Sequence, residues 1–176
     1  MLMDEDITSR SRDAAADRPP ILSSIEIDNL LSARLIPNLA TVNQDGSVHV
    51  LLIWFLRVGN DIDLPTSSHT HKYRNVRERP GASVMIDVSR VGLDLKGVLI
   101  RGLVELVYGE DVRQINRLIH LKYVTPEGLS EAKVAAYLSK GDDVTVKIYM
   151  DHLISWNLVG SKAGGKALSL RQIPST

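Results

Sequence analysis

The chain has 176 residues, of which 44% are hydrophobic and 24% charged, which is enough for one globular domain with a core and too few for two typical domains. Lys plus Arg and Asp plus Glu both number 21, so the charge balance favours neither a nucleic-acid surface nor an acidic disordered chain. The chain has no Cys, which excludes disulfides, thiolate catalysis and Cys-based metal sites.

The ends of the chain differ from its middle. Residues 1–20 show no hydrophobic periodicity and end in Pro19 and Pro20, which predicts a disordered leader. The sequence contains neither a secretory signal nor an uninterrupted apolar stretch of about 18 residues, so we expect a cytoplasmic protein that does not cross a membrane. One domain is expected over residues 21–158, followed by a flexible Gly- and Lys-rich tail over residues 159–176.

The first half of the domain predicts a helix followed by a meander of strands. A capping box formed by Ser23 and Glu26 precedes apolar residues at helical spacing up to Leu35. Three strand patterns separated by hairpin turns follow, at residues 39–42, 48–58 and 62–66. Polar and basic residues then predict a short helix within residues 68–79, closed by Pro80.

The second half predicts more strands with helices between them. Alternating apolar residues indicate strands within residues 84–88 and 95–107, and one or two more from Val144 to Leu158. A helix begins near Gly109, with Val112, Ile115, Leu118, Ile119 and Tyr123 at helical spacing, and a second helix follows Pro126. Six or seven antiparallel strands with few helices describe a small closed or nearly closed barrel.

The segment from Leu64 to Arg77 is the most unusual in composition. At a predicted strand end it carries four hydroxyl groups, two imidazoles, one Lys and two Arg, and a helix begins within it. Hydroxyl donors, helix N-terminal amides and the compact charge of Lys72 together favour a phosphate. The alternative is a solvated basic helix with an ordinary N-cap.

Other residues suggest weaker possibilities. His69 and His71 would face the same way on an extended segment and could bind a metal with a third His, such as His49, His120 or His152. Surface or hydrogen-bonded histidines are commoner than ligands, however, and we predict no metal. Trp54 could stack on an aromatic ligand or fill the core, and packing is favoured for Trp156. No nucleotide-binding glycine motif, P-loop or nucleophile elbow occurs. The catalytic residues therefore stay unknown, and a bound organic cofactor would carry any chemistry.

Several stretches, taken in order, carry a resemblance to a known family. They read LATV and DGSVHVLLIWF within residues 39–55, LPTS and HKYRNVRERP within 64–80, ASVMID at 82–87, LKGVLIRGLVEL at 95–106 and SW at 155–156. The chain resembles the pyridoxamine 5'-phosphate oxidase-like family of flavin-binding split barrels over residues 25–158. In this context the phosphate interpretation of Lys72 gains weight over the solvated helix.

The resemblance implies a mainly β (α+β) fold, a six-stranded antiparallel split β-barrel with a few flanking helices. Members of the family are usually homodimers with the cofactor in grooves at the subunit interface. By resemblance, backbone groups of the second strand around Val50, Leu51, Leu52, Ile53 and Trp54 would border the flavin ring. The flavin phosphate would be held by Pro65, Thr66, Ser67, Thr70, His71 and Lys72, with assistance from Asn75.

The sequence departs from the family pattern at two places. His71 stands where family oxidases often carry Arg, which exchanges a permanent charge for one that depends on pH. Residues 158–176 lack the basic pattern that binds the substrate phosphate in pyridoxamine phosphate oxidases proper, which argues against vitamin B6 oxidation.

The resemblance favours an FMN-binding oxidoreductase that acts on an unidentified small molecule as a homodimer, without nucleic-acid partners. A reductase that uses the deazaflavin coenzyme F420 is the enzymatic alternative, because that branch also shares the Trp after the second-strand run and the Lys before the helix. A non-catalytic protein that binds flavin or haem is the other alternative, because no acid–base set stands out.

Overall fold

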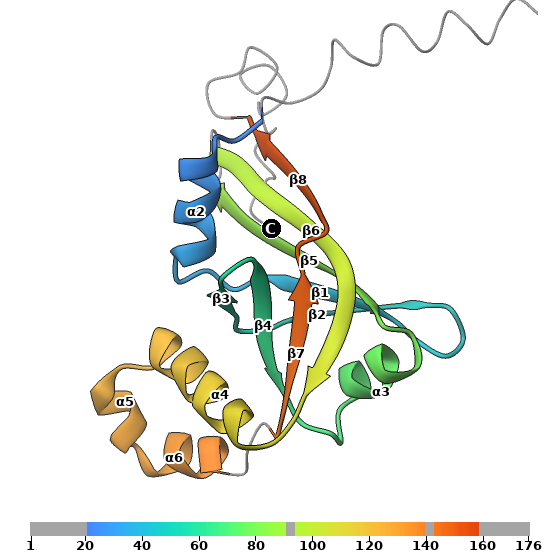
Figure 1. The fold of residues 1–176 in the computed structure, drawn as a ribbon. Coiled ribbons are helices and arrows are strands. Elements are labelled where there is room, and N and C mark those ends of the chain that lie inside the picture. Colours follow the sequence, from blue (N-terminus) through green and yellow to red (C-terminus); the bar gives the residue numbers. More distant parts are fainter. Residues whose placement is uncertain (1–20, 91–93, 140–142, 159–176) are drawn as a thin grey trace, which may run out of the picture.

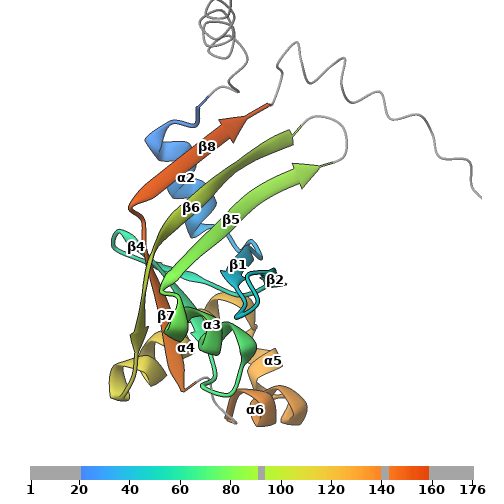
Figure 2. The same cartoon turned by 90° about the vertical axis from the view of Figure 1, so that its right-hand side faces the viewer.

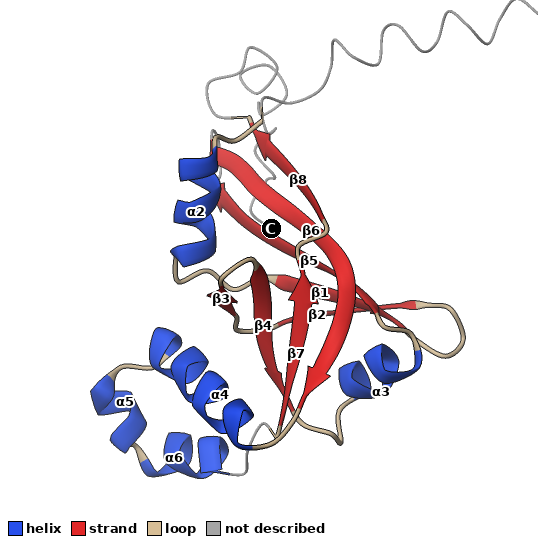
Figure 3. Ribbon diagram, viewed as in Figure 1, coloured by secondary structure: helices blue, strands red, loops and turns tan. Residues whose placement is uncertain are grey.

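The computed structural model describes residues 21–90, 94–139 and 143–158. The expected leader, residues 1–20, and the expected tail, residues 159–176, lie outside the described residues. The described part is an antiparallel sheet with a few helices around it, as Figure 3 shows. The predicted fold class is therefore confirmed: the protein is mainly β, and its open, curved sheet is consistent with a split barrel.

The elements follow the labels of Figure 1. The strands are β1 (Asn38–Val42), β2 (Val48–Leu52), β3 (Leu56–Val58), β4 (Asp61–Thr66), β5 (Gly81–Arg90), β6 (Asp94–Val107), β7 (Val144–Tyr149) and β8 (His152–Asn157). The helices are α2 (Ser24–Ser32), α3 (His71–Glu78), α4 (Glu110–Tyr123), α5 (Pro126–Ser130) and α6 (Ala132–Ser139). The strand order is β2-β1-β5-β6-β7-β4-β3, and β8 pairs with β6.

The predicted long second strand, residues 48–58, is two strands. Residues Ile53–Phe55 separate β2 from β3 and turn inward, with the Ile53 amide donating to the Pro37 carbonyl at 3.1 Å and Phe55 completely buried. With this break and with two strands after residue 143, the described part of the chain forms a sheet of eight strands, where the residue pattern predicted six or seven and the resemblance six. Because β2 and β3 are the two edges of the strand order, the short link holds these edges near each other and the sheet curves into an incomplete barrel.

The long strand β6 joins the two parts of the sheet. Its residues 96–101 pair with β8, and its residues 104–107 pair with β7. Gly102 stands at the crossing, where an added Cβ would lie 1.8 Å from the Tyr149 backbone oxygen. A side chain larger than hydrogen does not fit there, so the glycine allows the end of β7 to pass close to β6 before β8 begins to pair with it. Figure 2 shows how strongly β5 and β6 bend through this region.

The core lies inside the curved sheet. Alternate residues of β4 to β7 point into it, as the sequence predicted, and α2 closes one opening with Leu30 and Leu31. The fully buried strand residues are Leu39, Ile62, Leu64, Val84, Ile86, Val98, Ile100, Val146 and Ile148. The predicted capping box at the start of α2 is confirmed, since the Ser23 amide donates to the Glu26 carboxylate at 2.9 Å.

Helix α4 packs on the outer face of β4 and β7 (Figure 1). Its Asn116 side chain accepts a hydrogen bond from the Thr145 hydroxyl at 2.9 Å and donates one to the Val144 carbonyl at 3.3 Å. The predicted helix after Pro126 is two short helices, α5 and α6, interrupted at Glu131. None of the helices in the described residues combines the length and the hydrophobicity that crossing a membrane requires.

Candidate cofactor-binding groove

A groove of about 410 Å³ opens at the split of the barrel, where β2 turns inward toward β3. Six of its lining residues were predicted from the sequence, and two, Ile36 and His120, were not. The predicted residues in the lining are Leu51, Leu52, Ile53, Trp54, Pro65 and Lys72. The structure therefore brings the second strand, the end of the third predicted strand and the first turn of α3 to one place.

The alternation of β2 decides which of its side chains reach the barrel interior. His49 and Leu51 are half-buried and face inward, beside Thr41 and Leu39 of β1. Val48, Val50 and Leu52 face the other side and are exposed. Val50 therefore has its side chain on the outer face of the sheet, and it is not among the residues that line the groove. The expectation for Val50 concerned its backbone groups and stays a prediction.

An aromatic cluster holds Trp54 in the wall of the groove. The Trp54 ring stacks on Tyr123 with a centroid distance of 5.1 Å and an interplanar angle of 4°, and meets His120 edge-on at 5.9 Å. The Tyr123 hydroxyl donates to the Leu35 carbonyl at 2.6 Å and accepts from the Phe55 amide at 3.4 Å. Burial raises the pKa of Tyr123 to about 12. One face of Trp54 is thus already occupied by Tyr123, which fixes the ring against the groove.

The hydroxyl groups before α3 build the loop that presents Lys72. Thr70 is the N-cap of α3, its Oγ1 accepting from the Tyr73 amide at 3.3 Å and donating to the Ser67 carbonyl at 2.8 Å. Thr66 is completely buried, with its Oγ1 2.9 Å from that of Thr70. The hydroxyl groups of Thr66 and Thr70 therefore have partners within the loop. The Lys72 side chain lines the groove.

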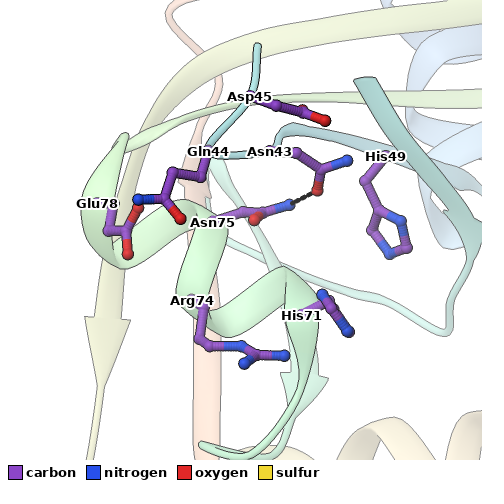
Figure 4. A pocket seen from close by; sticks show the side chains of 8 residues that line it. All are labelled: Asn43, Gln44, Asp45, His49, His71, Arg74, Asn75 and Glu78. Carbon is purple, nitrogen blue, oxygen red and sulfur yellow. Dashed lines mark hydrogen bonds between the residues drawn. The ribbon is translucent and has the colours of Figure 1, made fainter. Parts of the chain in front are cut away.

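A second pocket, of about 690 Å³, lies between α3 and the β1–β2 hairpin (Figure 4). It contains the remaining predicted residues His71 and Asn75, and its full lining is Asn43, Gln44, Asp45, His49, His71, Arg74, Asn75 and Glu78. The buried Asn75 amide group donates to Thr41 Oγ1 at 3.0 Å and to Asn43 Oδ1 at 2.8 Å. Asn75 therefore fastens α3 to the hairpin.

The histidines are not gathered around a common point. The rings of His49 and His71 lie 6.2 Å apart between centroids, and within the described residues no group of three His, Asp or Glu side chains is placed to hold a metal ion. His120, which the sequence suggested only as a third metal ligand, lies instead in the wall of the groove. Its helical spacing from Asn116 and Tyr123 is the signal that places all three on the buried face of α4.

Residues 24–144 match the family model described as pyridoxamine 5'-phosphate oxidase. No curated protein matches the chain significantly.

Three solved structures with the same fold are each 20% identical to the chain in sequence. A conserved hypothetical protein from Mycobacterium tuberculosis has a TM-score of 0.66 at 20% identity, over 89% of this chain and 93% of that one. An F420 reductase has a TM-score of 0.57 at 20% identity, over 76% of this chain and 98% of that one. A FAD-binding protein from Mesorhizobium loti has a TM-score of 0.55 at 20% identity, over 77% of this chain and 94% of that one. At this identity the structural likeness concerns the fold alone.

Proposed function

Because the chain belongs to the pyridoxamine 5'-phosphate oxidase family, we propose that it is an oxidoreductase that binds a flavin-type cofactor in the split groove and acts on a small molecule. FMN is the cofactor we propose, since it is the smallest that has both a flavin ring and a phosphate. Such a cofactor supplies hydride transfer, and the chain supplies binding, orientation and electrostatics.

The observation that carries the proposal is the combination of an apolar wall and an ammonium group in one groove. Leu51, Ile53 and Trp54 give a surface suited to a flat ring system, while Lys72 stands in the first turn of α3, where backbone amides also favour an anion. A ligand pocket of about 300–1,000 Å³ is usual for small organic ligands, and the groove of about 410 Å³ lies within this range. The residues therefore fit a phosphorylated flavin.

Binding of FMN tests the proposal directly. Purified protein titrated with FMN should quench flavin fluorescence, and Lys72→Ala should weaken FMN binding about 10- to 100-fold, the loss of one charge-assisted contact. Lys133→Ala, which removes an exposed lysine of α6, is the matched control and should leave the affinity unchanged. Protein that neither retains nor binds FMN would rule out the assignment.

We further propose that a second copy of the chain covers the outer face of β2. Val48, Val50 and Leu52 on this edge strand are 64%, 57% and 67% exposed. Residues directly opposite each other on neighbouring strands have their side chains on the same face of the sheet. Leu52 is opposite Asn38, which is opposite Met85, and Met85 is opposite Leu99, which is opposite Ile154. The exposed row of β2 therefore continues across the sheet to Met85 and Ile154. An apolar row of this extent is typical of an interface. Because Leu52 also lines the groove, the second copy would complete its wall.

The oligomeric state tests this part of the proposal. Light scattering should give twice the chain mass of 19.4 kDa, and Val48→Glu should produce a monomer that binds FMN more weakly, because the groove then lacks its second wall. Val58→Glu places the same charge on the opposite edge strand, where Val58 is 40% exposed, and should stay dimeric. A monomeric wild-type chain would contradict the shared groove.

Coenzyme F420 is the second candidate cofactor, supported by the structural likeness to an F420 reductase. It also combines a flavin-like ring with a phosphate, so the same groove residues would serve it. Parallel fluorescence titrations with FMN and F420 separate the two, and tighter binding of F420 would replace FMN in the proposal. A Soret band in the absorption spectrum of the purified protein would instead indicate that the chain binds haem.

A further inference from the structure

His120 is a buried imidazole in the wall of the groove. The residue is 8% exposed and lines the groove, and its ring meets the Trp54 indole edge-on, at 5.9 Å between centroids and an interplanar angle of 73°. Trp54 belongs to the apolar wall that suits a flat ring system. The imidazole therefore lies beside the part of the groove in which hydride transfer would take place.

Two neighbours on α4 hold His120 in this position. Asn116 lies four residues before it and makes two hydrogen bonds to β7, and Tyr123 lies three residues after it and donates to the Leu35 carbonyl at 2.6 Å. Residues at these spacings share one face of a helix. The helix cannot turn His120 away from the groove without breaking these hydrogen bonds, so the imidazole is oriented before a ligand binds.

Two of the described residues that line the groove carry titratable side chains, Lys72 and His120. An imidazole gains and loses a proton between about pH 5 and 8, whereas a lysine ammonium ordinarily keeps its proton in this range. Lys72 therefore suits a permanent anion, such as the phosphate of the cofactor. His120 is the lining residue that suits proton exchange with a ligand.

Charged side chains on the elements around His120 contact other groups. Lys122, two residues along α4, lies over the Phe55 ring at 3.6 Å from its centroid. Asp63 of β4 and Lys147 of β7, the strands on which α4 packs, form an ion pair at 3.2 Å. Their mutual pairing leaves proton exchange in the groove to the imidazole. The other titratable side chains of these two strands, of β3 and of the last two turns of α4 are Arg57, Asp61, Arg117, Tyr123 and Tyr149.

We propose that His120 is the proton-donating residue of the groove and acts on a small molecule whose reduction requires one proton. This inference rests on the proposed function, because the bound cofactor supplies the hydride. In a conjugated carbonyl compound, hydride adds to one carbon of the C=C bond, the displaced electron pair takes a proton from the imidazolium, and water protonates the neutral imidazole again. The small molecule thereby gains a hydride and a proton and is reduced, while the cofactor loses a hydride and is oxidised.

The emission of Trp54 reports the protonation of His120 without any cofactor. In a Trp156→Phe background Trp54 is the remaining Trp, since the chain has two, and a charged imidazolium at its edge quenches an indole. The emission should therefore fall as the pH is lowered from about 8 to 5, and His120→Gln should abolish this fall. His152→Gln removes an exposed histidine of β8, so it is the matched control and should keep the fall.

Two electron acceptors separate proton transfer from electron transfer. Protein loaded with FMN is reduced by dithionite without oxygen and mixed with cyclohexenone, which takes up a hydride and a proton, or with ferricyanide, which takes up electrons alone. His120→Gln should slow the reaction with cyclohexenone about 10²- to 10⁴-fold, the usual contribution of a general acid, and leave the reaction with ferricyanide unchanged. His152→Gln should change neither reaction.

The results distinguish failure of the inference from failure of the proposed function. The inference is overturned by an emission that does not change with pH, by a change that persists in His120→Gln, or by a cyclohexenone reaction no faster in the wild type than in His120→Gln. Equal slowing with both acceptors would indicate a structural role and overturn it as well. In each of these cases FMN binding keeps the proposed function, whereas absence of FMN binding would overturn both. Circular dichroism verifies that each variant folds, and His120→Asn replaces His120→Gln if the latter does not.

Discussion

The hydroxyl group of Tyr123 provides a sharp test of how the groove wall is held. Tyr123→Phe keeps the ring that stacks on Trp54 and removes the group that bonds the Leu35 carbonyl at 2.6 Å and the Phe55 amide at 3.4 Å. A partly buried backbone group without its partner costs about 1–3 kcal/mol, and the longer bond adds little, so we expect a loss of about 2 kcal/mol in the free energy of unfolding. For a chain of this size that corresponds to a fall in Tm of about 4–8 °C.

Calorimetry and tryptophan fluorescence separate the two roles of Tyr123. The chain has two Trp, so a Trp156→Phe background isolates the emission of Trp54. Tyr123→Phe should lower Tm and leave that emission nearly unchanged, while Tyr123→Leu should also shift the emission because the stacked ring is lost. Tyr108→Phe removes an exposed hydroxyl that contacts Tyr73 at 3.1 Å and is the control. A loss below about 0.5 kcal/mol for Tyr123→Phe, the range of ordinary surface substitutions, would refute the reasoning.

Three further changes test the framework around the groove. Burial lowers the pKa of Lys122 from 10.5 to about 8, so as the pH rises the folded chain releases this proton before the unfolded chain does. The free energy of unfolding should therefore rise between about pH 8 and 10, by about 1 kcal/mol after discount for solvent screening. Lys122→Met should flatten this rise when stability is measured by urea titration at each pH. Lys147 lies 3.2 Å from the completely buried Asp63, so Lys147→Met should cost about 3–5 kcal/mol at neutral pH. Burial raises the pKa of Asp63, so as the pH falls the folded variant takes up a proton before the unfolded chain does, and its deficit in stability should shrink; a deficit that does not change as the pH is lowered would contradict this assignment. Gly102→Ala should lose at least about 3 kcal/mol or fail to fold, whereas Gly81→Ala, whose Cβ meets no described atom within 4 Å, should stay close to wild type.

The sequence predicts the strands well where the alternation of apolar residues alone defines them. The apolar residues of β4, β5, β6 and β7 alternate as expected, since every second side chain of a strand faces the core. In β4 and β7 the polar residues between them, such as Asp63 and Thr145, are buried as well. The break between β2 and β3 was not predicted, because the apolar run from Val48 to Val58 shows no turn residue. The Ile53 amide still continues the β1–β2 register by donating to the Pro37 carbonyl, and what separates the strands is tertiary, because the Tyr123 hydroxyl takes the Phe55 amide away from the sheet.

Helix α4 shows where a periodic pattern misleads. Leu118 was expected on the buried face, yet it is 50% exposed, and Asn116 and His120 are buried instead. Hydrophobicity alone cannot find such positions, because Asn116 is buried through its hydrogen bonds to β7 and His120 through its contact with Trp54. The same limit explains why His120 was missed as a groove residue.

The sequence named Lys72 and the residues from Leu51 to Trp54 as candidate ligand contacts, and the structure places them in one groove. The division between two pockets was not predicted. Consecutive residues such as His71 and Lys72 are neighbours in a sequence motif, while on a helix they point about 100° apart. The structure therefore assigns them to different cavities. Likewise Val50 and Leu51 stand together in the motif and lie on opposite faces of β2.

The position of the groove follows from the same constraint that leaves the barrel open. Residues Ile53–Phe55 connect the edge strands β2 and β3, and a link of this length could close a hairpin. The two strands pair with β1 and β4 instead of with each other, and the Phe55 amide is taken by the Tyr123 hydroxyl. The link instead folds inward against Tyr123 and presents Trp54 at the opening. Helix α3 is tied to the hairpin beside this opening by Asn75, so the ammonium of Lys72 reaches the same space. An unpaired edge strand can promote aggregation. Here the edge strand β2 forms one wall of the groove, and Lys72 gives the same groove a charged group.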